Sequence, residues 1–237
     1  MGGRRDHVLV GPTRARLGLR QEMNNLDVQT AYWDAAAETK TFAHPLNLER
    51  FGGLLSKSAE ILDYGCGYGR TCAELTAGGY RYVTGVDISE LMIERGHSLF
   101  PGLDLRRIMG TALPFAAETF DACILFAVLT CVPTDAGQQE VIAALRRVLR
   151  PGGILYVSDY PLQTDTRNQE RYRAFAEVYG SFGVFRLPEG AILRHHDMRW
   201  IYELLDAFDL LHEDRLAVRT MNGNPAQVFQ ILARKIK

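Results

Sequence analysis

The chain has 237 residues, of which 47% are hydrophobic and 23% charged, and its formal net charge is -1. This length and composition are sufficient for the core of one large globular domain. The nearly neutral charge does not indicate a nucleic-acid partner or a membrane surface, because both are usually met by clustered positive charge.

The first residues differ from the rest of the chain in composition. Residues 1–21 contain five arginines and a single acidic side chain, with no serine and no periodic apolar pattern. Arginine-rich targeting leaders are also rich in serine, so we interpret 1–22 as a flexible basic tail. The folded domain is then expected over 23–237, and Met23 is our hypothesis for the native start.

The cysteines and the apolar runs bear on the location of the protein. The four cysteines form no CxxC pair and match no zinc-ligand spacing, which favours reduced thiols and predicts no metal site. No secretory signal is recognisable, and the longest apolar run, ACILFAVLTCV, is shorter than the roughly 20 residues that span a bilayer. These observations predict a cytoplasmic protein.

Helix and strand patterns alternate between residues 30 and 160. A helix is predicted from residue 30 and a second one over 46–55, broken at its glycines. Strands are then predicted over 61–64, 82–88, 105–109, 120–129 and 154–160, with helices over 70–77, 89–99 and 135–149 and a turn at 151–153. The strand at 120–129 is a nearly continuous apolar run, typical of a strand buried on both faces of a parallel sheet. Short strand–helix connections of this kind predict a doubly wound sheet.

The pattern changes after residue 160. Residues 161–197 are polar, aromatic and irregular, and we interpret them as an insertion of helices and loops. An amphipathic helix is predicted over 198–208, followed by two closing strands over 210–220 and 226–235. The expected fold is therefore α/β, a seven-stranded and mostly parallel doubly wound sheet with helical additions at the N-terminus and after the fifth strand.

The stretch ILDYGCGYGR, residues 61–70, contains three glycines directly after the first strand. Ligands of doubly wound sheets bind at such strand-to-helix turns, where glycine lets the backbone adopt positive φ and approach a ligand closely. The last position of the dinucleotide pattern G-x-G-x-x-G, counted from Gly65, is occupied by Arg70, and the glycine spacing alone leaves a dinucleotide as an alternative ligand. Asp63, just before the glycines, disfavours a pyrophosphate and favours a cationic ligand or an amino group.

Four segments in order resemble the class I S-adenosylmethionine-dependent methyltransferases. ILDYGCGYGR is similar to motif I of that family, and GVDIS places Asp87 where the family keeps an acid for the ribose hydroxyls. ALPFAAETFDACILFAVLTCVP resembles the family's fourth-strand region, and LRRVLRPGGILYVSDY resembles its fifth-strand signature. Together these segments cover residues 60–160.

The resemblance implies a binding site for S-adenosylmethionine, with S-adenosylhomocysteine as the product form. The glycine turn, Asp63 and Arg70 would hold the amino-acid end of the cofactor, and Asp87 would accept the ribose hydroxyls. Thr111 stands where members often have aspartate for the adenine amino group, which leaves Thr111 and the Ala112 backbone as substitutes. The site residues implied are Tyr32, Asp63, Gly65, Cys66, Gly67, Gly69, Arg70, Asp87, Ile88, Met92, Thr111, Ala112 and Phe126. Trp33 is the alternative to Tyr32 as a cover from the N-terminal helix.

The methyl acceptor is expected on the side of the insertion. An acceptor hydroxyl or ammonium needs a base, and the candidates are His195, His196 and Tyr160. The two histidines are alternatively ordinary loop residues before a helix that begins at Asp197. Interleaved arginine and aromatic residues in the insertion favour a small, anionic organic acceptor; they are alternatively a surface packed on the sheet, or a platform for an RNA base.

The sequence therefore predicts a methyltransferase that acts on a small molecule by in-line displacement. The alternative within the class is a methyltransferase of tRNA or protein. The alternatives from other classes are an NAD(P)-dependent oxidoreductase on a similar sheet and a binding module without turnover. The acceptor atom and the oligomeric state are left open by the sequence.

Overall fold

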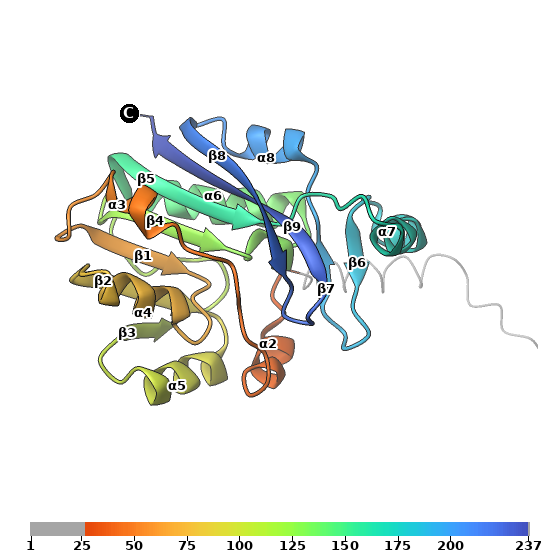
Figure 1. Cartoon of the computed structure of the whole chain (residues 1–237), viewed down its shortest axis with the longest axis horizontal. Helices are drawn as coiled ribbons and strands as arrows, with labels where there is room; N and C mark the ends of the chain where they lie inside the picture. The colour runs from red at the N-terminus through yellow and green to blue at the C-terminus, as the bar shows by residue number, and fades with distance from the viewer. Residues whose placement is uncertain (1–26, 237) are drawn as a thin grey trace, which may run out of the picture.

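A seven-stranded sheet forms the centre of the computed structural model, which describes residues 27–236 (Figure 1). The strands lie in the order β3-β2-β1-β4-β5-β9-β8. Their bounds are β1 Glu60–Tyr64, β2 Tyr82–Asp87, β3 Asp104–Arg107, β4 Phe120–Phe126, β5 Leu149–Asp159, β8 Phe208–Arg219 and β9 Pro225–Lys235. Neighbouring pairs from β3 to β5 are parallel, and β9 and β8 are antiparallel. The predicted doubly wound, mostly parallel sheet is confirmed.

Helices cover both faces of the sheet. Their bounds are α2 Thr30–Ala36, α3 Leu48–Gly52, α4 Arg70–Ala77, α5 Glu90–Leu99, α6 Asp135–Val148, α7 Thr166–Tyr179 and α8 Met198–Leu204. In β4, Cys123 and Leu125 face the core on the α6 and α8 side, whereas Ala122 and Ile124 face the core on the α3 and α4 side. All four side chains are fully buried, so the continuous apolar run reflects burial on two faces.

The apolar stripe of α6 anchors that helix on the sheet. Val141, Ile142, Leu145 and Val148 follow helical spacing, and all four are buried. Burial of each such side chain contributes about 1.5–3 kcal/mol before the cost of ordering the chain. The Thr134 hydroxyl accepts a hydrogen bond from the Gly137 N–H and caps the start of this helix.

The structure differs from the sequence-based expectation around the fifth strand. β5 begins at Leu149, and the predicted turn at 151–153 is a bulge within the paired strand, with Gly152 at φ 76°. β4 ends at Phe126, because Ala127 has φ 55° and a 3-10 turn, η1, follows over Leu129–Cys131. The bulge lies where β4 and β5 begin, whereas the change at Ala127 lies at the edge of the sheet where the parallel strands end.

The insertion contains strands that the sequence did not indicate. After α7, β6 Val184–Arg186 pairs antiparallel with β7 Ile192–Arg194 in a second, two-stranded sheet. The parallel strands of the main sheet point toward α2, β6 and β7, and α7 lies beyond β6 (Figure 1). The basic tail at 1–22 and the start at Met23 lie outside the described residues. Within residues 27–236, no helix combines the length and the apolar character needed to cross a membrane.

Candidate active site

A cavity of about 200 Å³ opens where the carboxyl ends of the parallel strands meet. Asp63, Asp87, Phe126 and Tyr160 line it from the ends of β1, β2, β4 and β5. The sheet order reverses between β1 and β4, which is the place where ligands of doubly wound sheets bind. The sequence-predicted residues that line the cavity are Asp63, Gly65, Cys66, Gly67, Arg70, Asp87, Ile88, Met92, Thr111, Phe126, Tyr160 and His195.

The glycine turn is held to the neighbouring strand by backbone and carboxylate hydrogen bonds. Gly65, Gly67 and Gly69 have φ values of 74°, 54° and 81°, a region that side chains rarely adopt. Asp87 accepts hydrogen bonds from the Gly67 N–H at 2.9 Å and from the Ser89 N–H at 2.8 Å. Burial raises the pKa of Asp87, and these hydrogen bonds oppose that shift. The carboxylate therefore fixes the turn against β2.

Gly69 packs closely against a neighbouring strand, and its predicted contact with a cofactor stays a prediction. It is the residue that precedes α4, and it does not line the cavity. A Cβ atom at this position would lie 2.8 Å from a methyl group of Leu105. Its φ and this close approach explain the third glycine without a ligand.

Asp63 is a buried carboxyl group beside the glycine turn. Its side chain is 2% exposed, and the Cys72 thiol donates to its Oδ2 at 3.4 Å. Burial raises the pKa of Asp63 to about 7. An ammonium group placed against it would favour the ionised form, so this carboxyl suits a ligand with an amino group. Cys66 is also buried, and burial raises the pKa of its thiol, which argues against a nucleophile.

Arg70 is positioned by the chain segment that precedes the first strand. Its guanidinium donates to the His44 carbonyl at 2.6 Å and to Glu74 at 2.5 Å. Phe42 and His44 line the cavity, although nothing in the sequence singled them out. A Cβ atom at Gly67 would lie 2.7 Å from the Phe42 ring, which shows how closely this segment crosses the turn.

Trp33, the alternative to Tyr32 as a cover for the cofactor, lines the cavity, whereas Tyr32 does not. Tyr32 packs edge-on against Trp33 at 5.0 Å, and its hydroxyl is buried without a partner among residues 27–236. The prediction that Tyr32 covers the cofactor is therefore not supported by its position. Ala112 also lies outside the lining, while Thr111 lines the cavity and its hydroxyl donates to Glu140 at 3.3 Å.

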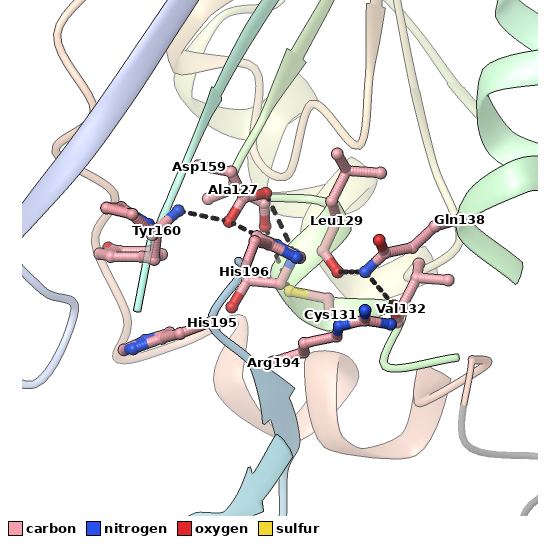
Figure 2. A network of polar contacts seen from close by, with 12 residues as sticks. Ala127, Leu129, Cys131, Val132, Gln138, Asp159, Tyr160, Arg194, His195 and His196 are labelled. Atoms are coloured by element: carbon pink, nitrogen blue, oxygen red, sulfur yellow. Dashed lines mark hydrogen bonds and ion pairs between the residues drawn. The ribbon is translucent and has the colours of Figure 1, made fainter. Parts of the chain in front are cut away.

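His195 and His196 follow β7, and their rings point in opposite directions (Figure 2). The His195 ring stacks on Tyr160 at 5.2 Å and lines the cavity. The His196 ring is fully buried, with its Nε2 3.5 Å from an oxygen of Asp159. His196 is absent from the cavity lining, so it cannot take a proton from an acceptor bound there. This corrects its assignment as a candidate base.

The hydrogen bonds of His195 also bear on its predicted role as a base. The Tyr172 hydroxyl lies 2.5 Å from Nδ1, and its oxygen accepts from the Gln163 N–H at 3.1 Å. We assign the hydroxyl proton to the hydrogen bond with Nδ1, which places the ring proton on Nε2. Burial holds the pKa of His195 well below its usual range, and the ring stays neutral. His195 therefore offers the cavity a donor rather than a basic lone pair.

Tyr160 is likewise a donor. Burial and the neighbouring Asp159 raise the pKa of its hydroxyl, which stays protonated at neutral pH. The His44 ring lies edge-on to Tyr160 at 4.9 Å, and the His195 ring stacks on Tyr160 at 5.2 Å. Two imidazole rings thus hold the Tyr160 ring at the end of β5.

The insertion and the β8–β9 hairpin complete the far end of the cavity. Asn168 and Arg171 of α7, Phe185 of β6 and Arg219 of β8 line it. The mixed arginine and aromatic composition of the insertion was the only signal for Arg171 and Phe185, and nothing in the sequence indicated Asn168. Nothing in the hairpin sequence indicated that Arg219 would reach the site.

Comparison with known proteins identifies the family. Residues 62–157 match the model described as a methyltransferase domain. A ubiquinone biosynthesis O-methyltransferase of Hahella chejuensis is 34% identical over 173 residues, which cover 69% of this chain and 68% of that protein. The chain belongs to the S-adenosylmethionine-dependent methyltransferases. The family assignment made from the four sequence segments is confirmed.

Two further comparisons support this assignment. The protein of the same name in Saccharophagus degradans is 32% identical over 168 residues, which cover 67% of this chain and 66% of that protein. The crystal structure of an S-adenosylmethionine-dependent methyltransferase from Methanosarcina mazei is 27% identical, with a TM-score of 0.75, and the match covers 83% of this chain and 99% of that one. The chain spans about two thirds of the length of the two ubiquinone biosynthesis O-methyltransferases.

The cavity fits S-adenosylmethionine, the cofactor of the family. Arg70 Nε, His44 Nε2 and Thr130 Oγ1 are buried beside it and have no hydrogen-bond partner among residues 27–236. Buried polar groups of this kind are normally paired, so a ligand with several polar groups is expected here. When bound, the cofactor supplies a methyl group already activated on a sulfonium.

Proposed function

We propose that this methyltransferase transfers the methyl group to an oxygen atom of a small-molecule acceptor. The observation that carries the proposal is the continuity of one cavity from the glycine turn to the insertion. A cofactor held at the turn and an acceptor held beneath α7 and β6 would then meet within one enclosed space. The O-methyltransferase names of the relatives support oxygen as the acceptor atom.

The polar side chains around the glycine turn indicate how the cofactor would be held at this end of the cavity. Asp63 would pair with the amino group, and Arg70 Nε would face the carboxylate end. Asp87 retains unused acceptor capacity after its two backbone hydrogen bonds, which suits the ribose hydroxyls. Trp33, Ile88 and Met92 supply apolar surface for the remainder of the cofactor.

The acceptor end of the cavity is suited to orient the acceptor molecule and not to remove a proton from it. Tyr160 and His195 both present donors, and their rings are stacked on each other. Holding the acceptor oxygen in line with the activated methyl group supplies several kcal/mol of the acceleration, because methyl transfer is a displacement that depends on alignment. An acceptor that ionises readily, such as a phenol, fits a site of this kind better than an alcohol.

Titration of the purified protein with S-adenosylhomocysteine and, separately, with NAD tests the proposed cofactor. Binding of the former without the latter is expected. Binding of NAD alone would favour the oxidoreductase alternative, and binding of neither would refute the assignment of this cavity to either ligand. Methyl transfer to tRNA or protein is tested separately, by incubating either one with the protein and S-adenosylmethionine and measuring the S-adenosylhomocysteine that forms.

Substitution of Asp87 by alanine should weaken binding of S-adenosylhomocysteine by roughly 1–3 kcal/mol, the range expected for lost hydrogen bonds to a charged group. Calorimetric titration measures the change. The Asp209→Ala variant removes an exposed carboxylate with no role in the cavity and serves as the matched control. Equal affinities of the Asp87→Ala variant and the wild-type protein would contradict the role of Asp87.

A further inference from the structure

Positive charge gathers at the acceptor end of the cavity, and among the described residues only one of its three arginines forms an ion pair with a carboxylate. Arg167, Arg171 and Arg219 line this end. Among the described residues, Arg171 has no ion pair, Arg219 donates to the Gly223 carbonyl, and the nearest carboxylate to Arg167 is that of Asp165 at 3.9 Å. Arg167 and Arg219 are exposed to solvent, whereas Arg171 is half-buried, so the cost of burying an unpaired guanidinium falls on Arg171 and an anion bound there would relieve it.

The carboxylates that line the cavity are engaged at other places. Asp63 and Asp87 lie at the glycine turn, where they accept hydrogen bonds from Cys72 and from the backbone. Asp27 accepts from the Thr134 N–H at 3.0 Å, at the start of α6. The two ends of the cavity therefore differ in charge: carboxylates surround the cofactor end, and arginines surround the acceptor end.

Arg171 is held in a fixed orientation. Its guanidinium carbon lies 3.5 Å from the centre of the Phe185 ring, and its Nε is buried without a hydrogen-bond partner. Stacking on a ring occupies one face of the planar guanidinium and leaves its edge donors available. Such a fork matches the two oxygens of a carboxylate, which it can bind through two parallel hydrogen bonds.

His195 supplies a second donor against the same ring. Its imidazole packs edge-on to Phe185 at 4.9 Å, so His195 and Arg171 contact one aromatic side chain. The hydrogen bond from Tyr172 to Nδ1 leaves the proton on Nε2, which has no partner among residues 27–236. Leu187, Leu193 and Met221 give this end an apolar wall.

We propose that the methyl acceptor is a small aromatic acid whose carboxylate binds to the Arg171 guanidinium and to the Nε2–H of His195. The inference rests on the proposed function and adds the chemical class of the acceptor to it. The aromatic ring would lie against the apolar wall and Tyr160, and the hydroxyl that accepts the methyl group would point toward the cofactor end. The carboxylate would supply the charge that the arginines lack.

The test compares aromatic ligands that carry a carboxylate, a neutral ester or a phosphate. Binding of 3,4-dihydroxybenzoate and 4-hydroxybenzoate is measured in the presence of saturating S-adenosylhomocysteine, next to their methyl esters and phenyl phosphate. We expect the acids to bind roughly ten- to a hundredfold more tightly than the esters, the value of a charge-assisted pair of hydrogen bonds. Preference for phenyl phosphate over both acids would overturn the assignment to a carboxylate.

Variants of residues in α7 separate the effect of the arginine charge on binding from an effect on folding. The Arg171→Met variant keeps the aliphatic stem and should lose the preference for acids, whereas Arg171→Lys should keep only part of it. The matched control is Arg173→Met, two residues further along α7, where the side chain is exposed. All three variants should bind S-adenosylhomocysteine with wild-type affinity, which reports on their folding.

The possible results distinguish this proposal from the proposed function. Absence of S-adenosylhomocysteine binding to the wild-type protein would refute the function and this inference together. Binding of S-adenosylhomocysteine with equal or no affinity for acids and esters would overturn the acidic acceptor and leave the function intact. An acid preference that survives in the Arg171→Met variant would also overturn the proposed acidic acceptor. Loss of the acid preference in the Arg171 variants, but not in Arg173→Met, would support it.

Discussion

The Gly65→Ala substitution is expected to lower the free energy of unfolding by roughly 2–5 kcal/mol and to abolish detectable binding of the cofactor product. Gly65 has a φ of 74°, and this left-handed conformation costs an alanine about 1–2 kcal/mol. A Cβ atom there would lie 2.3 Å from a methyl group of Val128, and relieving such an overlap costs about 1–3 kcal/mol more. Val128 lines the cavity, so the displaced methyl group would also change the shape of the site.

Urea denaturation of the wild-type and variant proteins measures the loss of stability, and titration with S-adenosylhomocysteine measures the loss of binding. Gly102→Ala is the matched control, because its added Cβ atom meets no heavy atom within 4 Å and Gly102 has no positive φ. The control should unfold within about 0.5 kcal/mol of the wild-type protein. An equally stable Gly65→Ala variant would mean that Val128 can move away without cost.

The cofactor end could be predicted because its residues are fixed by local rules. Asp63, Asp87 and Phe126 lie at the ends of parallel strands, and such ends meet at one edge of the sheet. The apolar run that identifies β4 and the glycines that follow β1 are signals contained within ten residues. Gly69 illustrates an ambiguity of such signals, because one residue type serves both a ligand turn and close packing, and only the structure shows its approach to Leu105.

The acceptor end could not be predicted because distant segments build it. Arg171, Phe185 and Arg219 come from three elements of the chain that no local pattern connects. His195 and His196 illustrate the same limit at short range. Successive side chains of an extended segment point to opposite sides, so two adjacent histidines cannot share one cavity, and the sequence alone does not say which of them enters it.

The electrostatics of Asp63 lead to the second large expected effect, a pH dependence of stability. The pKa of Asp63 rises from an ordinary value of 3.8 to about 7 in the folded protein, because the carboxyl is 2% exposed. Between these two values the folded state holds a proton that the unfolded state has released. The stability of the ligand-free protein should therefore fall as the pH rises through this window, by about 4 kcal/mol in total.

The Asp63→Asn variant stays neutral at every pH, so it should lack this loss and be more stable than the wild-type protein at about pH 8. Cofactor binding should change in the opposite direction. The ionised carboxylate attracts the amino group of the ligand, so affinity of the wild-type protein for S-adenosylhomocysteine should rise between about pH 6 and about pH 8, approaching tenfold per pH unit below the pKa. The affinity of Asp63→Asn should be lower at about pH 8 and nearly constant with pH.

Urea denaturation and calorimetric titration at several pH values measure both effects on the same proteins. Asp209→Asn is the matched control, because that carboxylate is exposed and lies outside the cavity, and it should reproduce both wild-type profiles. A wild-type affinity that does not change with pH would show that Asp63 does not meet the amino group. A stability profile of Asp63→Asn that parallels the wild-type profile would show instead that water reaches the carboxyl group and that its ionisation is not opposed by burial.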